Sequence, residues 1–132
     1  MDNYLEYFKK DKFAAYCGIE LTECRPGFAK AEVRIAPHHL NGAGVLHGGL
    51  LFTLADFAFA AAVNSYGTVT LSVAAQITYF DKSTEGLIIA EAREVSRSNK
   101  LIHCDIEIRH ASGNLLANFK GTAYRTSQKI NF

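Results

Sequence analysis

The chain combines one long stretch that is apolar on every side with several stretches in which apolar and polar residues alternate. Residues 48–63 contain a single charged residue, Asp56. A segment of this length rich in Leu, Ala and Phe predicts a helix, and a helix that is apolar all round must be surrounded by other elements. In residues 102–108, Ile and Cys alternate with charged residues and His, which predicts a strand with one buried face. A strongly curved antiparallel sheet wrapped around the helix satisfies both patterns within an α+β fold.

Six strands are expected from β-rich runs that turn residues separate. They cover residues 19–24, 28–35, 68–80, 87–97, 101–110 and 115–125. Arg25-Pro26-Gly27 predicts a hairpin turn, and the linkers 81–86, 98–100 and 111–114 are interpreted as hairpin connections. The last four strands would therefore form an antiparallel meander.

The two ends of the chain carry weaker patterns. Apolar residues between positions 5 and 16 predict one short amphipathic helix that ends near Gly18. Residues 126–132 are expected to fray, although Ile130 and Phe132 could dock on a neighbour. Residues 36–46 contain Pro, Asn and Gly and predict a loop.

Composition limits the number of domains, the kinds of partner and the cellular location that we expect. A chain of 132 residues suits a single domain, and its formal charge of +1 provides no overall field for nucleic acid or an anionic membrane. Three scattered Cys residues without a C-x-x-C pair argue against disulfides and zinc, and His38-His39 lacks matching metal-ligand spacing. The charged N-terminus does not resemble a signal peptide, and the apolar run is too short to cross a bilayer. We expect a soluble, cytoplasmic protein with reduced thiols, no metal and no membrane partner.

Asp56 is the residue that packing explains least. Burying a carboxylate in an apolar segment costs several kcal/mol unless it is paired, protonated or faces a cleft. It is therefore either a core Asp whose oxygens accept hydrogen bonds from backbone or hydroxyl donors, or a carboxylate kept for chemistry.

The spacing of Asn41, His47-Gly48-Gly49 and Asp56, followed by Leu71-Ser72-Val73, resembles the hotdog-fold acyl-CoA thioesterases, and most of all their PaaI-type branch. The likeness covers about residues 19–126, the core of a single hotdog domain expected over residues 1–132. It implies a curved antiparallel sheet around a long central helix, with a short N-terminal helix.

The resemblance also implies chemistry for particular residues. Asp56 would act as general base or nucleophile, and the Gly48 N–H, at a helix start, would stabilise the oxyanion. Asn41 and Ser72 would hold the thioester or the lytic water, although a turn Asn and a tolerated strand Ser are equally simple interpretations. His47 is expected to anchor the helix start rather than to join a Ser-His-Asp triad, since no nucleophile elbow is present.

The spacing of two of these residues predicts an assembly. Eight residues of helix between Gly48 and Asp56 amount to about 12 Å of rise, so one carbonyl cannot reach both. The two groups must come from different chains of a homodimer, in agreement with the family, which further suggests a homotetramer.

The substrate would be an acyl-CoA, with CoA as part of the substrate and no separate cofactor. Arg97, Ser98 and Lys100 form a basic turn that resembles a family segment touching CoA, although most basic turns are simply solvated. Two other functions stay open: a hotdog hydratase acting on enoyl or β-hydroxyacyl thioesters, and a non-catalytic acyl-CoA binding protein.

Overall fold

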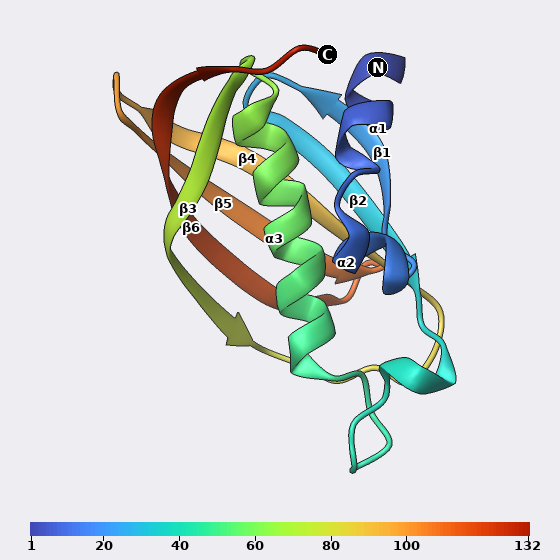
Figure 1. Ribbon diagram of the computed structural model, residues 1–132. Helices are drawn as coiled ribbons and strands as arrows, with labels where there is room; N and C mark the ends of the chain where they lie inside the picture. The colour runs from blue at the N-terminus through green and yellow to red at the C-terminus, as the bar shows by residue number, and fades with distance from the viewer.

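A curved antiparallel sheet of six strands wraps around one long helix (Figure 1). The computed structural model describes residues 1–132. The strands are β1 (Glu20–Arg25), β2 (Phe28–Arg34), β3 (Thr68–Tyr79), β4 (Leu87–Arg97), β5 (Leu101–His110) and β6 (Leu115–Lys129). The helices are α1 (Asp2–Phe8), α2 (Lys12–Tyr16), the short 3-10 helix η1 (Pro37–His39) and α3 (Gly48–Asn64). The central helix α3 contacts all six strands, as predicted for an apolar helix.

The order of strands in the sheet is β1-β2-β4-β5-β6-β3, which corrects the predicted meander. The β1–β2, β4–β5 and β5–β6 hairpins are present, but β3 pairs with β6 and the linker 81–86 crosses to β4 at the centre of the sheet. Turn residues mark where a strand ends but do not specify its neighbour. The burial pattern agrees with the observed order. Alternate residues of β4 are fully buried, whereas most residues of β3 are exposed, as in a strand at the edge of a sheet.

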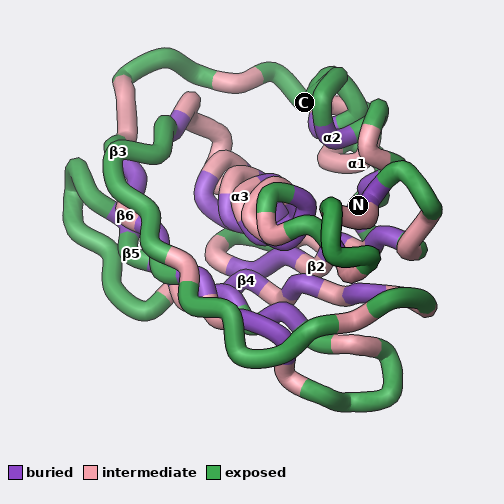
Figure 2. Tube along the Cα trace, turned by 90° about the horizontal axis from the view of Figure 1, so that it is seen from below, coloured by how far each residue is buried: buried purple, intermediate pink, exposed green.

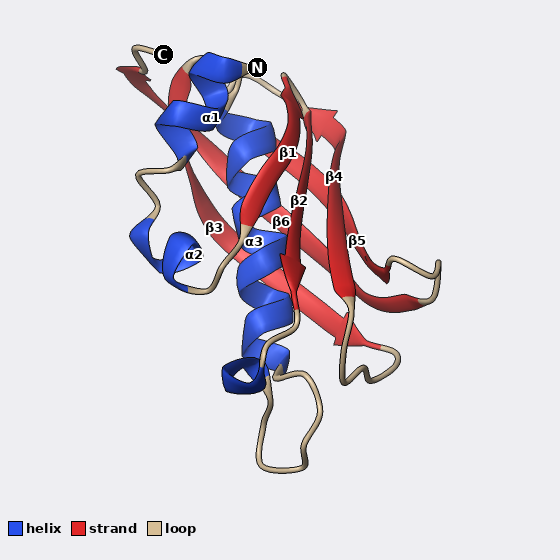
Figure 3. Ribbon diagram, turned by 90° about the vertical axis from the view of Figure 1, so that its right-hand side faces the viewer, coloured by secondary structure: helices blue, strands red, loops and turns tan.

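Both chain ends differ from the prediction. The N-terminal segment forms two helices rather than one, because the Asp11 carboxylate accepts a hydrogen bond from the Ala14 N–H at 3.0 Å and so starts α2 as a new helix. The tail does not fray: β6 continues to Lys129, and the Phe132 ring packs edge-on against Tyr4 of the same chain with ring centroids 4.8 Å apart. The N-terminal helix and the C-terminal tail thus lie against each other at one end of the sheet (Figure 3).

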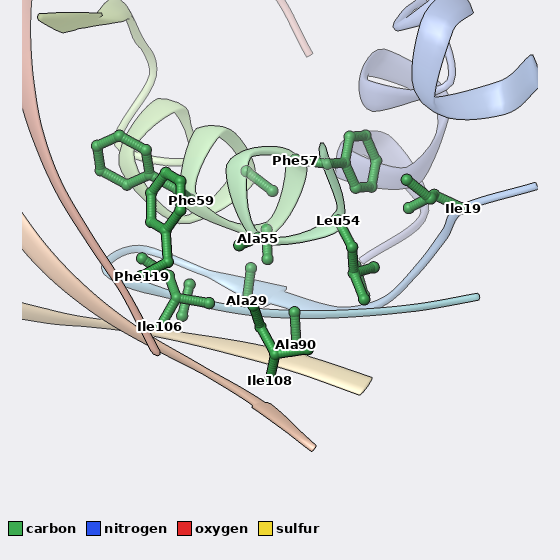
Figure 4. Packing of buried hydrophobic residues seen from close by; sticks show 14 of the residues in the cluster. Ile19, Ala29, Leu54, Ala55, Phe57, Phe59, Ala90, Ile106, Ile108 and Phe119 are labelled. Carbon is green, nitrogen blue, oxygen red and sulfur yellow. The ribbon is translucent and has the colours of Figure 1, made fainter. Parts of the chain in front are cut away.

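The core lies between α3 and the sheet. Ile102, Ile106 and Ile108 are completely buried, which confirms the alternation predicted for β5. Figure 4 shows Phe59 of α3 directed toward Phe119 of β6, while Phe57 points to the opposite flank, toward Ile19. The sheet packs tightly against the helix at Gly121. A Cβ there would lie 2.7 Å from a Phe59 ring carbon, so only glycine fits.

One stripe of α3 is not covered by the chain itself. Gly49 is exposed, and Phe52, Thr53, Asp56 and Ala60, at helical spacing, are only partly buried. Viewed end-on, α3 lies against the sheet on one side (Figure 2). The prediction that the helix is surrounded therefore holds for the sheet-facing sides but not for this stripe.

No helix of the chain is both long and apolar enough to span a bilayer.

Candidate active site

Asp56 lines a cavity of about 430 Å³ that α1, α3 and β3 enclose. Most of its walls are apolar, with Tyr7, Phe59 and Leu71 among them. No protein donor forms a hydrogen bond with the Asp56 carboxylate, and no Lys or Arg forms an ion pair with it. The interpretation of Asp56 as a structurally satisfied core residue is therefore wrong.

The environment makes this carboxyl harder to ionise than a solvated Asp. Burial raises the pKa of Asp56 above its ordinary value, and the nearby Asp11 carboxylate raises the pKa further. Asp11 and Lys10, from the linker between α1 and α2, line the same cavity. Neither residue was predicted from the sequence. Their only signal was a group of charges that interrupts an amphipathic helix pattern.

Ser72 shares the cavity with Asp56. It pairs across the sheet with the buried Ala123, and cross-strand partners lie on the same face, so the Ser72 side chain faces α3. Two consecutive elements, α3 and β3, thus bring a carboxylate and a hydroxyl to one apolar cavity.

Asn64, at the end of α3, joins the helix to the start of β3. Its Oδ1 accepts a hydrogen bond from the Thr70 N–H at 2.8 Å, and its Nδ2 donates to the Thr70 carbonyl at 3.0 Å. Nδ2 also donates to the Ala60 carbonyl at 2.8 Å. Asn64 therefore forms the two backbone hydrogen bonds that a neighbouring strand would otherwise form with Thr70. Thr70 lies two residues before Ser72. Nothing in the sequence pattern indicates this role of Asn64.

Gly48 lies at the opposite end of the helix from Asn64. The His47 side chain caps α3 because its Nδ1 accepts a hydrogen bond from the Gly49 N–H at 2.8 Å. The Gly48 N–H has no hydrogen-bond acceptor within the chain. The Tyr79 hydroxyl donates to the Gly48 carbonyl at 3.0 Å, and a Cβ at position 48 would lie 3.0 Å from the Tyr79 ring. A side chain at position 48 would therefore require the half-exposed Tyr79 ring to shift by a few tenths of an ångström.

Asn41 organises the loop before α3. Its side-chain Oδ1 accepts hydrogen bonds from the N–H groups of Ala43 at 2.9 Å and Val45 at 3.3 Å, as in an Asx turn. The side-chain nitrogen has no partner in the chain and stays available as a donor. Asn41 does not line the cavity of Asp56.

Of the three residues of the basic turn, Arg97 ends β4, and Ser98 and Lys100 lie between β4 and β5. The Arg97 guanidinium stacks over the Tyr66 ring at 4.3 Å, and its Nε lies 3.6 Å from a Glu94 oxygen. The Lys100 Nζ lies 5.8 Å from the centroid of the Tyr124 ring. The Ser98 hydroxyl accepts a hydrogen bond from the Leu101 N–H at 3.1 Å. These residues line neither the Asp56 cavity nor the helix start.

The predicted site residues fall into two separate groups in the chain. Asp56 and Ser72 lie at the cavity, whereas the Gly48 N–H, His47 and Asn41 lie at the start of α3 and in the loop before it. Gly48 and Asp56 belong to one unbroken helix, so about 12 Å of axial rise separates them.

Comparison with known proteins identifies the family. Residues 43–117, 75 of 132 and more than half of the chain, match the thioesterase superfamily. The chain belongs to this superfamily. It is 32% identical over 124 residues to the acyl-coenzyme A thioesterase PaaI of Escherichia coli, covering 93% of this chain and 89% of that protein. It is 29% identical over 110 residues to human acyl-coenzyme A thioesterase 13, covering 80% of this chain and 79% of that protein.

The fold of this thioesterase is the same as that of a relative found by sequence. The solved structure of the E. coli PaaI protein superposes with a TM-score of 0.91 at 30% identity, over 96% of this chain and 92% of that one. The expected hotdog fold of the PaaI type is confirmed. The matched residues 43–117 include His47, Gly48, Asp56 and Ser72 but not Asn41.

Proposed function

We propose that this thioesterase hydrolyses acyl-CoA to a free acid and CoA at sites that two copies of the chain share. Asp56 would remove a proton from water or attack the thioester carbonyl directly, and the Gly48 N–H would stabilise the developing oxyanion. The reaction needs only water and the CoA thioester, with no metal or further cofactor. The acyl-CoA thioesterases among its relatives support this substrate class.

One observation carries the proposal: a partly buried carboxylate without a hydrogen-bond donor in its own chain lies at the wall of an apolar cavity. Such a group lowers stability at neutral pH. Its folded-state pKa is raised, so the folded chain binds the proton more tightly than the unfolded chain does, and stability falls as the pH rises through this window. Catalysis explains the presence of a residue that folding does not favour.

A second copy of the chain would supply the missing donor. The edge strand β3 is 12 residues long and leaves its outer backbone groups without a strand neighbour, which makes it a template for pairing. Leu71 and Val73 on this strand are 58% and 61% exposed. We infer that two β3 strands pair antiparallel about a two-fold axis and form a homodimer.

The position of the axis follows from contacts within one chain. Ser72 lies by Asp56, whereas Tyr79 touches Gly48, so α3 and β3 run in opposite directions. A two-fold axis between residues 75 and 76 brings Ser72 opposite Tyr79 of the copy. Asp56 of one chain then approaches Gly48 of the other, twice per dimer.

The remaining predicted residues receive supporting roles. The free Asn41 side-chain nitrogen would donate to the thioester or water, Ser72 would hold the attacking water, and His47 would keep the Gly48 N–H aimed outward through its cap. Arg97, Ser98 and Lys100 would contact the CoA moiety. We further propose that two dimers associate as a homotetramer.

The first experiment replaces Asp56 with Asn, and release of free CoA thiol is followed for short, long and aromatic acyl-CoAs. We expect a loss of about 10³-fold or more in kcat, since the general base or nucleophile is removed. The melting temperature at neutral pH should stay equal or rise, because a buried charge disappears. Near-normal turnover in D56N would sink the proposal. A wild-type protein that binds acyl-CoA without releasing thiol, or that hydrates crotonyl-CoA, would favour the two other functions.

The second experiment tests the shared site by complementation. One chain carries Asp56→Ala and the other Gly48→Pro, which removes the N–H at a helix position that tolerates proline. Each variant alone should be inactive. In a random mixture half of the dimers contain one intact site, so about a quarter of wild-type activity should return. Demonstrated heterodimers without activity would contradict the shared site.

A further inference from the structure

A second cavity, of about 300 Å³, lies on the other side of α1 from the Asp56 cavity. Leu5, Ala14 and Ala15 of the two N-terminal helices line it, together with Ile19 and Phe57. Phe57 points to the flank of α3 opposite Phe59, which lines the Asp56 cavity (Figure 4). The two cavities therefore lie side by side over α3, one against β3 and the other against β1.

Two side chains, Phe8 and Asp11, line both cavities. Phe8 is the larger and is 7% exposed. Its ring is held edge-on against Tyr7, with ring centroids 5.1 Å apart, and the Phe132 ring of the C-terminal tail lies 6.4 Å from it. The apolar part of the dividing wall is therefore one aromatic ring at the end of α1, held against the C-terminal tail. Both cavities have other apolar residues in their walls, so each would remain apolar without the Phe8 ring.

We propose that Phe8 is a specificity-determining residue that ends the acyl pocket of this thioesterase. The inference rests on the proposed function, in which the acyl group occupies the apolar part of the Asp56 cavity. With Phe8 in place the acyl chain stops at the ring, so short or compact acyl groups are favoured. Without the ring the two cavities join, and a longer chain continues under α1 and α2 toward Phe57.

The experiment compares Phe8→Ala and the milder Phe8→Leu with wild type. For each, kcat/KM is measured by thiol release for butanoyl-, octanoyl- and dodecanoyl-CoA. Each methylene that moves from water into an apolar site changes affinity by a factor of about four, so three newly buried methylenes suffice for more than tenfold. We expect the ratio of kcat/KM for dodecanoyl-CoA over butanoyl-CoA to rise at least about tenfold in F8A and less in F8L.

Two controls separate the joined cavity from a loosened N-terminus. Tyr4→Phe removes the hydroxyl that donates to the Ser65 carbonyl at 3.3 Å and weakens the attachment of α1 without touching either cavity. It should leave the chain-length ratio at the wild-type value. Ala15→Phe, at an exposed position that lines only the second cavity, should cancel the gain when combined with F8A. Melting curves establish that every variant is folded.

The outcomes are distinguishable. If wild type and folded F8L both hydrolyse acyl-CoA with the same chain-length ratio, Phe8 does not end the pocket and the inference is overturned. A ratio that Y4F raises as much as F8A also overturns it, because a loosened helix then suffices. If wild type hydrolyses no acyl-CoA at all, the proposed function fails first, and this inference fails with it.

Discussion

Removing the Asn64 side chain should uncouple the two elements that bring Asp56 and Ser72 together. In Asn64→Ala, the Thr70 N–H and carbonyl lose their partners on the open side of β3. Thr70 is 4% exposed, so water reaches these groups poorly. The start of β3 is then held by β6 alone, two residues from Ser72.

The expected cost follows from these bonds. Each is worth about 0.5–1.5 kcal/mol net, so the loss of two lowers the free energy of unfolding by about 2 kcal/mol. That corresponds to a factor of about 30 in the unfolding equilibrium constant. The third bond, to the Ala60 carbonyl, joins groups within the helix and adds little. Activity should fall beyond what the unfolded fraction explains, since Ser72 shifts in the remaining folded molecules.

Urea unfolding and kcat for one good acyl-CoA substrate measure the two effects separately. Asn3→Ala is a matched control, because Asn3 is exposed on α1 and makes no side-chain hydrogen bond. It should change neither quantity. Full wild-type kcat in N64A, at a substrate concentration and temperature where the protein is folded, would refute the positioning argument. An unchanged urea midpoint would refute the energetic one.

Two other substitutions test the site and the core. Asp11→Asn keeps the cap on α2 but removes the charge that raises the pKa of Asp56, so the acidic limb of the kcat/KM pH profile should move to lower pH. An unmoved limb would exclude Asp11 as a determinant of Asp56 ionisation. Gly121→Ala places a Cβ 2.7 Å from the Phe59 ring and should cost about 1–3 kcal/mol in urea unfolding. Gly42→Ala, where a Cβ meets nothing within 4 Å, should cost nothing comparable, and equal effects of the two would contradict the packing explanation.

Much of the fold could be predicted from the sequence, because helices and strands follow from the local periodicity of apolar residues. The Leu87–Arg97 and Leu101–His110 strands were predicted to the residue, and α3 begins one position after its His47 cap. The position of β3 was not predicted, because pairing across a sheet depends on which faces become buried and not on the linker that follows a strand. The break between α1 and α2 was missed because a single Asp cap outweighed a continuous apolar pattern.

The candidate site, too, was determined partly by the sequence and partly by the tertiary structure. The sequence by itself determined that Asp56 is a charge in an apolar helix, and that helical rise separates it from Gly48 whatever the rest of the fold. Only the tertiary structure decided that Asp56 has no hydrogen-bond partner, that Asp11 and Ser72 lie at its cavity and that Phe8 divides the apolar space beyond. The physical reason is that rise along a helix is a property of consecutive residues. Desolvation and cavity walls depend on residues that folding brings together from α1, α3 and β3.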